Sequence, residues 1–275
     1  MTAIGSAIDF FRRPKLFKRW RKFLHVRRMK KETSLYNRAA PGRQRQPRGR
    51  YLYASPVGED GKPWLKKIIG RFGCEQFEYI IFAYDDTSFD EDIFRKCVVI
   101  REKGLHFYFL KKYITPSVCS NYDYLFLWCD DIDVVDFRPS EFVNIMQTNN
   151  IELAQPALTA DSYFTWDITL QNKTYKVGRY VDFVEIMVPV FTSEAWVRFW
   201  NKMEAEKNYW GWGYDLFARS VCGYANMGII DCLPVRHVRP VGARRDHNAV
   251  REVGYMMDKY AGYRLAEKVS YGALR

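Results

Sequence analysis

The stretch YDYLFLWCDDID, residues 122–133, decides the fold class of the chain. Its first seven residues are almost wholly apolar, which is typical of a strand covered on both faces of a parallel sheet. The strand runs directly into an acidic cluster, Asp130, Asp131 and Asp133. Because ligands of open α/β sheets bind at the carboxyl ends of strands, the stretch predicts a central buried strand with a polar site at its end.

The sequence on both sides of this stretch alternates between strand-like and helical patterns. Apolar and β-branched runs predict strands over 51–54, 77–84, 98–100, 151–154, 181–191 and 228–231. Helical spacing predicts helices over 64–72, from about 89, 139–147, 193–203 with Ser193 as its cap, and 215–221. The periodicity of 105–113 does not settle its state. The order predicts an α/β, Rossmann-like single domain over residues 51–275, with a mostly parallel central sheet flanked by helices.

The composition is that of a packed globular protein. Hydrophobic residues make up 48% and aromatic residues 17% of the 275 residues, which excludes a disordered or fibrous chain. The sequence contains no run of eighteen or more apolar residues, so no segment is expected to span a bilayer as a helix. Arginines interrupt every apolar stretch near the N-terminus, so no signal peptide is expected. These features predict a cytoplasmic protein.

A basic leader, residues 1–50, precedes the domain. It holds sixteen Lys or Arg against Asp9 and Glu32, so it accounts for all of the net charge of +11. Between 14 and 28, apolar and basic side chains recur at helical spacing, which predicts an amphipathic helix and peripheral contact of residues 10–28 with an anionic membrane surface. A helix packed on the domain and a disordered segment are the alternatives, with nucleic acid binding well behind them. Residues 39–50 are predicted to be a linker.

The acidic cluster indicates a divalent cation. Asp131 and Asp133 leave one residue between two oxygen donors, and carboxylates this close repel one another unless a cation lies among them. Mg²⁺ or Mn²⁺ held by one or two carboxylates and by a diphosphate is the expected arrangement. An ordinary solvated turn is the alternative, because surface loops produce D-x-D patterns by chance.

Five blocks of sequence resemble a known family. The blocks are YDYLFLWCDDIDVVDF, IELAQPAL, FVEIMVPVF, WGWGYD and GIIDCLPVRHVRPVG, and their order and spacing are similar to those of the domain-of-unknown-function 707 family. The resemblance covers roughly residues 51–245, and members of that family look like glycosyltransferases of the GT-A fold. The family often has an acidic residue where this chain has Cys129. The D-x-D motif can therefore be placed over residues 129–131 or over residues 131–133. Asp131 belongs to both placements, and Asp133 belongs only to the second.

The resemblance implies a metal-dependent transfer of a sugar from a nucleoside diphosphate donor, UDP, to a glycan hydroxyl. The sugar could be a hexose or a pentose such as xylose. In this interpretation Asp215 is the base that takes the proton of the acceptor hydroxyl, and the transfer inverts the anomeric centre. Trp210 and Trp212 bind the acceptor by stacking on sugar faces. Composition alone would equally well make Asp215 a helix cap and the two tryptophans core residues.

The resemblance also assigns the metal and nucleotide sites. His237 is implied as the third metal ligand beside Asp131 and Asp133, although a single histidine is more often an ordinary hydrogen-bonded residue. Glu185 lies in an apolar run, so it is either paired with a cation or works in the acceptor site. The positions expected to bind the nucleotide sugar are Ala54, Ser55, Val57, Asp85, Lys111, Asp130 and Asp131.

Two other classes of function remain open at this point. A metal-dependent phosphohydrolase could use the same acidic cluster. A non-catalytic module that binds membranes or nucleic acid could use the basic leader, with the carboxylates serving only the fold.

Overall fold

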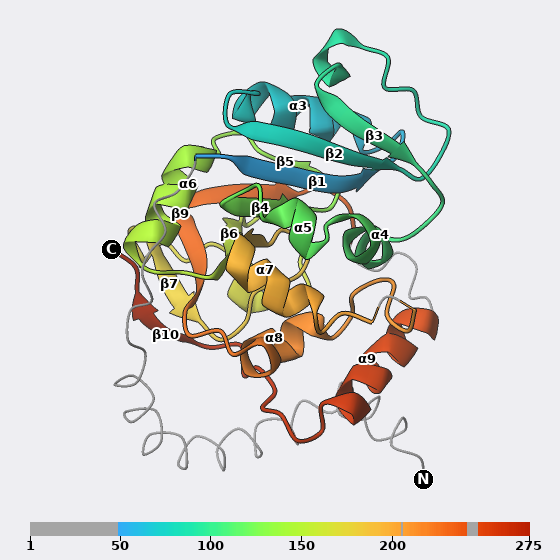
Figure 1. Cartoon of the computed structure of the whole chain (residues 1–275). Helices are drawn as coiled ribbons and strands as arrows, with labels where there is room; N and C mark the ends of the chain where they lie inside the picture. The colour runs from blue at the N-terminus through green and yellow to red at the C-terminus, as the bar shows by residue number, and fades with distance from the viewer. Residues whose placement is uncertain (1–48, 205, 241–246) are drawn as a thin grey trace. The chain divides into compact units, whose positions relative to one another are not determined.

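The computed structural model describes residues 49–204, 206–240 and 247–275 (Figure 1). The predicted amphipathic helix and the membrane contact of residues 10–28 lie outside the described residues. Among the described residues, no helix combines the length and the apolar character that crossing a bilayer requires.

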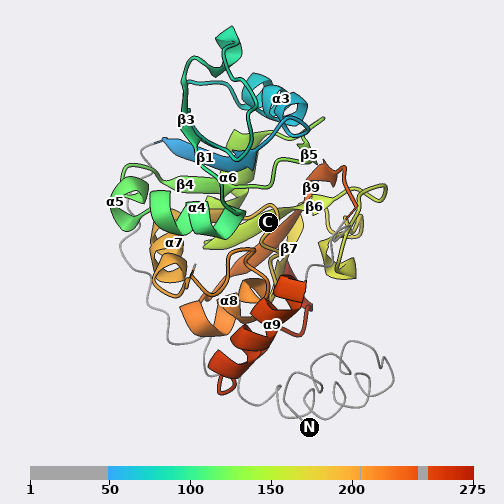
Figure 2. The same ribbon diagram turned by 90° about the vertical axis from the view of Figure 1, so that its right-hand side faces the viewer.

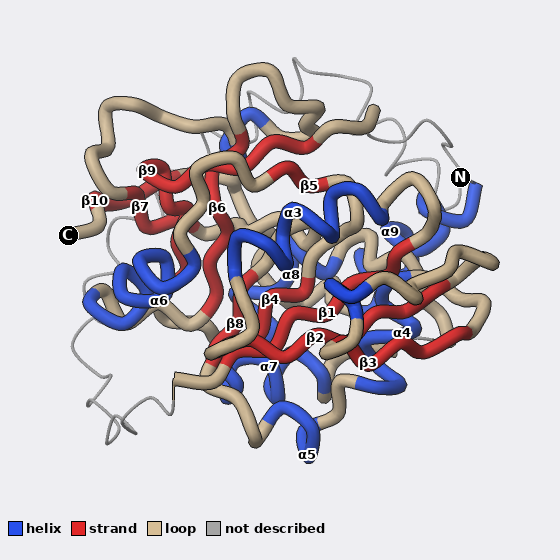
Figure 3. Tube along the Cα trace, turned by 90° about the horizontal axis from the view of Figure 1, so that it is seen from above, coloured by secondary structure: helices blue, strands red, loops and turns tan. Residues whose placement is uncertain are grey.

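Ten strands of the described chain form a single sheet in the order β10-β7-β9-β6-β8-β4-β1-β2-β3, and β5 pairs with β9 off this path. The strands are β1 Tyr51–Val57, β2 Phe77–Ala83, β3 Cys97–Arg101, β4 Tyr124–Leu127, β5 Ile132–Asp133, β6 Leu153–Leu158, β7 Gly178–Val181, β8 Val190–Thr192, β9 Met227–His237 and β10 Ser270–Ala273. Figure 3 shows β1, β2 and β3 side by side.

The sheet is mixed in direction. Strands β3, β2, β1 and β4 are parallel, and so are β6 and β9. Strand β8 is antiparallel to both β4 and β6, and β7 is antiparallel to β9. Parallel neighbours need a crossover, usually a helix, and between β6 and β8 the described chain has a short 3₁₀ turn and strand β7 but no α-helix. The α/β class is therefore confirmed, whereas the sheet that we predicted as mostly parallel is mixed.

Helices cover both faces of the sheet. They are α3 Lys62–Phe72, α4 His106–Tyr113, α5 Pro116–Cys119, α6 Pro139–Thr148, α7 Ser193–Trp200, α8 Tyr214–Cys222 and α9 His247–Lys259, with 3₁₀ turns at Asp92–Phe94 and Asp167–Thr169. Figures 1 and 2 show α3 on one side of the sheet and α4, α7 and α8 on the other. The apolar residues of α3 and α6 share one core with Tyr51 and Tyr53, and those of α4, α7 and α8 share a second with Leu52 and Ala54. This alternation along β1 is the two-residue period of a strand buried on both faces.

Helix α3 follows directly from its sequence. Its buried residues recur at helical spacing along one face: Leu65, Ile68, Ile69 and Phe72. Proline occupies the first turn, where a backbone N–H would have no partner within the helix. The helix ends at Gly73, whose φ of 71° disfavours a side chain.

Most of the predicted elements are present, but three differ. The strand predicted over 181–191 is two strands, β7 and β8, with a loop over 182–189, so Glu185 lies in a loop. The helix expected from about residue 89 is only the 3₁₀ turn Asp92–Phe94, and 105–113 forms α4. The cap of α7 is Thr192 rather than Ser193, because the Thr192 hydroxyl accepts a hydrogen bond from Ala195 N at 3.2 Å.

Candidate active site

The centre of the site is a pair formed by Asp131 and His237. Asp131 follows β4, and His237 is the last residue of β9. The antiparallel pairing of β5 with β9 sets Ile132 opposite His237, so Asp131 is next in sequence to the residue that pairs with His237. His237 Nε2 lies 3.0 Å from Asp131 Oδ2, and both side chains are largely buried.

The other ring nitrogen of His237, Nδ1, carries a proton. Nδ1 lies 2.8 Å from the carbonyl oxygen of Tyr163, which can only accept, so Nδ1 carries a proton and donates it. Nε2 then faces the Asp131 carboxylate either as a second N–H or as a lone pair. Burial alone would lower the pKa of His237, but the hydrogen bond and charge of Asp131 outweigh it and raise the pKa. The Asp131 carboxylate therefore favours the charged form of the His237 ring.

The pair fits a divalent ion. A carboxylate oxygen and an imidazole nitrogen are both ligand types that divalent metal ions accept. The second oxygen, Asp131 Oδ1, is buried and has no hydrogen-bond partner among the described residues. A buried carboxylate oxygen without a partner is costly unless a ligand satisfies it. Asp131 and His237 can thus supply two protein ligands to Mn²⁺ or Mg²⁺.

Asp133 is not brought to this pair. Its carboxylate lies 3.3 Å from Lys67 Nζ on α3 instead. Over the described parts of the chain, no group of three or more His, Cys, Asp or Glu side chains is placed to hold a metal ion. The remaining ligands of an ion at Asp131 would therefore come from a diphosphate and water.

Asp130 closes the site against the loop between β1 and α3. Its carboxylate accepts hydrogen bonds from Tyr84 OH at 3.1 Å and Gly58 N at 3.4 Å, and it pairs with Arg239 at 3.4 Å. Burial raises the pKa of Asp130 to about 6, although the charge of Arg239 opposes the shift. A Cβ atom built on Gly61 would lie 2.2 Å from Asp130 Oδ2. The loop can therefore approach Asp130 this closely only with glycine at position 61.

Gly61→Ala is expected to lower the stability of the protein by about 1–3 kcal/mol, because the new methyl group displaces the Asp130 carboxylate from its partners. Gly70→Ala is the matched control, since Gly70 lies in α3 with nothing within 4 Å of an added Cβ. That change should raise stability by about 0.5–1 kcal/mol. Urea midpoints of the two variants measure the difference. Equal stability of Gly61→Ala and the unmodified protein would contradict the close packing.

Two further buried acids are Glu185, which is near enough to His237 to interact with it, and Asp215, which interacts with Glu185. Asp215 is in the first turn of α8, and its Oδ1 accepts a hydrogen bond from Leu216 N at 2.8 Å. Burial raises the pKa of Asp215 to about 6. Burial, followed by the charge of Asp215, raises the pKa of Glu185 to about 8, while the charge of His237 opposes that shift. Glu185 is therefore close enough to interact with both Asp215 and His237, and its Oε2 has no hydrogen-bond partner in the described residues.

The predicted acceptor tryptophans lie on a tightly held turn before α8. Asn208 binds both ends of the turn, accepting from Gly211 N at 2.7 Å and donating to the carbonyl oxygen of Trp212 at 2.8 Å. The rings of Trp210 and Trp212 are 37% and 36% exposed, which leaves apolar surface for a ligand. Their role in acceptor binding stays a prediction.

Several predicted nucleotide contacts are placed elsewhere. Strand β1 extends to Val57 instead of ending at residue 54, so Ala54, Ser55 and Val57 are buried, and the loop begins only at Gly58. Asp85 accepts hydrogen bonds from Glu59 N at 3.1 Å and Thr87 N at 3.0 Å, so it supports the same loop.

Lys111 faces away from the acidic cluster. Its ammonium donates to the carbonyl oxygen of Trp200 at 2.7 Å and lies 3.6 Å from the centre of the Trp200 ring. The Lys111 side chain thus joins α4 to α7, and this geometry gives no support to a phosphate contact.

Sequence reasoning overlooked His106 and the carbonyl group of Tyr163. His106 begins α4, and its Nδ1 lies 3.7 Å from Cys129 Sγ. Burial lowers the pKa of His106 to about 4, against the charge of Asp131. A single histidine near the start of 105–113, whose secondary structure the sequence does not settle, does not indicate a site. A backbone carbonyl group cannot be recognised from residue types.

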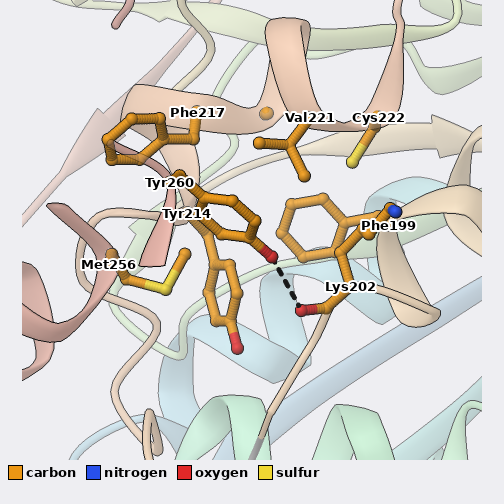
Figure 4. Close-up of a pocket in the computed structure, with 9 residues that line it drawn as sticks. Phe199, Lys202, Tyr214, Phe217, Val221, Cys222, Met256 and Tyr260 are labelled. Atoms are coloured by element: carbon orange, nitrogen blue, oxygen red, sulfur yellow. Dashed lines mark hydrogen bonds between the residues drawn. The ribbon is translucent and has the colours of Figure 1, made fainter. Parts of the chain in front are cut away.

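A separate pocket lies between α7, α8 and α9 (Figure 4). Its volume is about 10 Å³, roughly the space of one water molecule. Tyr260 OH donates a hydrogen bond to the carbonyl oxygen of Lys202 at 3.4 Å across it. It is too small for a nucleotide, and no acid lines it; the lining residues are Phe199, Lys202, Tyr214, Phe217, Ala218, Val221, Cys222, Met256 and Tyr260.

Comparison with known proteins agrees with this fold. A family described as "Protein of unknown function (DUF707)" matches residues 22–182 and 179–264. No curated protein matches the sequence. Among solved structures, "Crystal structure of GalNAc-T7 with UDP, GalNAc and Mn2+" is similar at 11% identity, with a TM-score of 0.54 over 76% of this chain. The likeness spans 47% of GalNAc-T7, so this chain corresponds to about half of that protein.

"Crystal structure of S. aureus TarS" is similar at 7% identity with a TM-score of 0.48, over 69% of this chain and 37% of TarS. At these identities the GalNAc-T7 likeness shows the fold alone, and it confirms the predicted GT-A-like architecture.

Proposed function

The chain belongs to the DUF707 family, and we propose that it is a metal-dependent glycosyltransferase that moves a sugar from UDP to a glycan hydroxyl with inversion. The observation that carries the proposal is the pairing of Asp131 with His237 beside two buried acids with raised pKa values, Glu185 and Asp215. These four side chains come from four separate segments of the chain. Such a convergence of perturbed titratable groups is typical of a catalytic site.

The metal would be held by Asp131 and His237, together with the diphosphate and water. When bound, the ion neutralises the charge that develops on the departing UDP. Arg239 adds a positive charge beside Asp130, and its Nη2 is buried without a hydrogen-bond partner among the described residues. A diphosphate would satisfy that donor.

Asp215 acts as the base. A carboxyl group with a pKa of about 6 is mostly ionised at neutral pH, so it can accept the proton of the acceptor hydroxyl. The hydroxyl oxygen then bonds to the anomeric carbon as the bond from that carbon to the diphosphate oxygen breaks. Glu185, with a pKa of about 8, is mostly protonated at the same pH and can donate a hydrogen bond to a sugar hydroxyl.

The comparison with GalNAc-T7 supports the choice of ligands. The crystal structure of GalNAc-T7 contains UDP, GalNAc and Mn²⁺, and its fold is similar to that of this chain. Trp210 and Trp212 would bind the glycan acceptor through their exposed rings, next to the start of α8.

A thermal-shift screen of nucleoside diphosphate sugars with and without Mn²⁺ tests the proposal. A ligand present at about 100 times its dissociation constant adds about 2.7 kcal/mol to stability, so a matching donor should raise Tm clearly, and only with the metal. A donor found this way is then assayed for sugar transfer to glycan acceptors. Release of UDP into water at a rate independent of acceptor would favour a phosphohydrolase. The absence of any metal-dependent shift would refute the proposal.

A further inference from the structure

Asp182, the residue after β7, holds the backbone on both sides of Lys268. Its carboxylate accepts hydrogen bonds from Glu267 N and Val269 N, each at 2.7 Å, and its own N–H donates to the carbonyl oxygen of Val269 at 3.2 Å. Lys268 between them has a φ of 57°, a left-handed backbone conformation that residues other than glycine rarely adopt. Such a conformation persists only where the surrounding structure imposes it, and it is frequent at functional sites.

The same segment is tied to the helix that carries Asp215. Ala266 N donates to the carbonyl oxygen of Leu216 at 2.8 Å, and Ser220 Oγ donates to that of Arg264 at 2.7 Å. Figure 1 shows the chain between α9 and β10 passing beside α8. Because Leu216 follows Asp215 directly, these bonds hold Lys268 near the start of α8.

Two aromatic rings confine the ammonium group of Lys268. Its Nζ lies 4.2 Å from the centre of the Trp166 ring and 5.6 Å from that of Phe183, within the range of cation–π attraction. The rings themselves are in edge contact, with their centres 5.9 Å apart. The position of the charge is therefore set by packing as well as by the backbone.

The charges that act on Asp215 come from both sides. Lys268 and the backbone N–H groups of Leu216 and Gly213 favour the ionised carboxylate, and burial opposes it. Glu185, from the loop between β7 and β8, would oppose it further if it were ionised, and His237 in turn acts on Glu185. Lys268 is the side-chain cation among these groups that favours an ionised Asp215.

We propose that Lys268 is a positioning residue for the transfer reaction: held by Asp182, its ammonium group keeps the Asp215 carboxylate ionised where the acceptor hydroxyl is to be deprotonated. The inference rests on the proposed function, in which Asp215 is the base. Lys268 touches neither reacting atom in this role, and its effect reaches the reaction through the charge of Asp215.

The test compares Lys268→Met with Lys268→Arg. Met keeps the length and the backbone strain but removes the charge, whereas Arg keeps the charge. Removing a cation that favours the carboxylate should raise the pKa of Asp215, so the acid limb of the kcat/KM profile moves to higher pH by about half a unit or more in Lys268→Met. Lys268→Arg should keep the limb of the unmodified protein. Lys207→Met is the control for net charge, because Lys207 also lies over an aromatic ring, that of Tyr255, at 5.3 Å.

A second readout does not depend on turnover. The ¹³C shift of the Asp215 carboxyl group, assigned with Asp215→Asn, is titrated in the same variants, and the pKa should rise only in Lys268→Met. An unchanged titration would overturn the inference. So would a raised KM for the donor with an unmoved acid limb, since Lys268 would then contact the substrate. Absence of transfer in the unmodified protein would refute the proposed function, while the titration would still decide whether Lys268 sets the charge of Asp215.

Discussion

Asp215→Asn is expected to reduce sugar transfer by about 10² or more while leaving nucleotide and metal binding intact. The amide cannot take a proton from the acceptor hydroxyl, but its oxygen can still accept the hydrogen bond from Leu216 N that Asp215 Oδ1 accepts at 2.8 Å. The start of α8 should therefore keep its geometry. Single-turnover transfer rates and calorimetric binding of UDP with Mn²⁺ measure the two effects separately.

Stability provides an independent check on this variant. The folded-state pKa of Asp215 is raised to about 6 by burial, so the carboxyl group stabilises the fold at low pH and this contribution is lost as the pH rises through about 6. The Asn variant lacks that loss, so its stability relative to the unmodified protein should improve between about pH 4 and pH 7.

Glu194→Gln is the matched control for Asp215→Asn. Glu194 is an exposed acid in the first turn of α7, so this change removes a similar favourable charge at a helix N-terminus without touching the site. It should leave transfer unchanged. Near-normal turnover of Asp215→Asn would remove Asp215 from the mechanism.

The sequence was sufficient to predict the central strand and the acidic residues that follow it, because the apolar run before Asp130 leaves a buried strand as the simplest interpretation. His237 was placed near them only by the family resemblance. What the sequence could not show is the pairing of β5 with β9, because two residues carry too little pattern to predict a strand. In the structure Asp131 meets His237, whereas Asp133 meets Lys67.

The loop over 182–189 shows where apolar patterns mislead. Val184 and Val188 are fully buried, so the run looks like a strand although its backbone forms no ladder. Long-range polar contacts set its conformation, with Gln155 accepting from Glu185 N at 2.6 Å and Asp182 binding the segment around Lys268. Contacts between residues so distant in sequence leave no periodic signal.

The structure gives no support to the assignment of Lys111 to phosphate binding, for a related reason. The sequence shows that a lysine precedes the acidic strand, but not which way its long side chain turns. In the structure the ammonium is satisfied by the Trp200 carbonyl oxygen and ring, and burial lowers the pKa of Lys111. The cation that pairs with Asp130 is instead Arg239, which lies more than a hundred residues further along the chain.

Asp131→Asn is expected to reduce the Mn²⁺-dependent gain in UDP affinity by about 100-fold or more. Losing a partner of a metal ligand already costs about 10–100-fold, and Asp131 would contact the ion directly. Asp136→Asn is the matched control, because Asp136 is an exposed acid a few residues further along the same segment. Calorimetric titration of UDP with and without Mn²⁺ gives the gain for each variant, and Asp136→Asn should keep that of the unmodified protein.

The same substitution separates the geometry of the pair from its function. Asp131 raises the pKa of His237, so Asp131→Asn should lower that pKa whether or not the protein binds a metal. If the His237 titration moves as expected and the Mn²⁺-dependent gain is unchanged, the pair exists but does not hold the ion. That outcome would remove the step that neutralises the leaving diphosphate, because the described chain has no group of three or more His, Cys, Asp or Glu side chains placed to hold the metal instead.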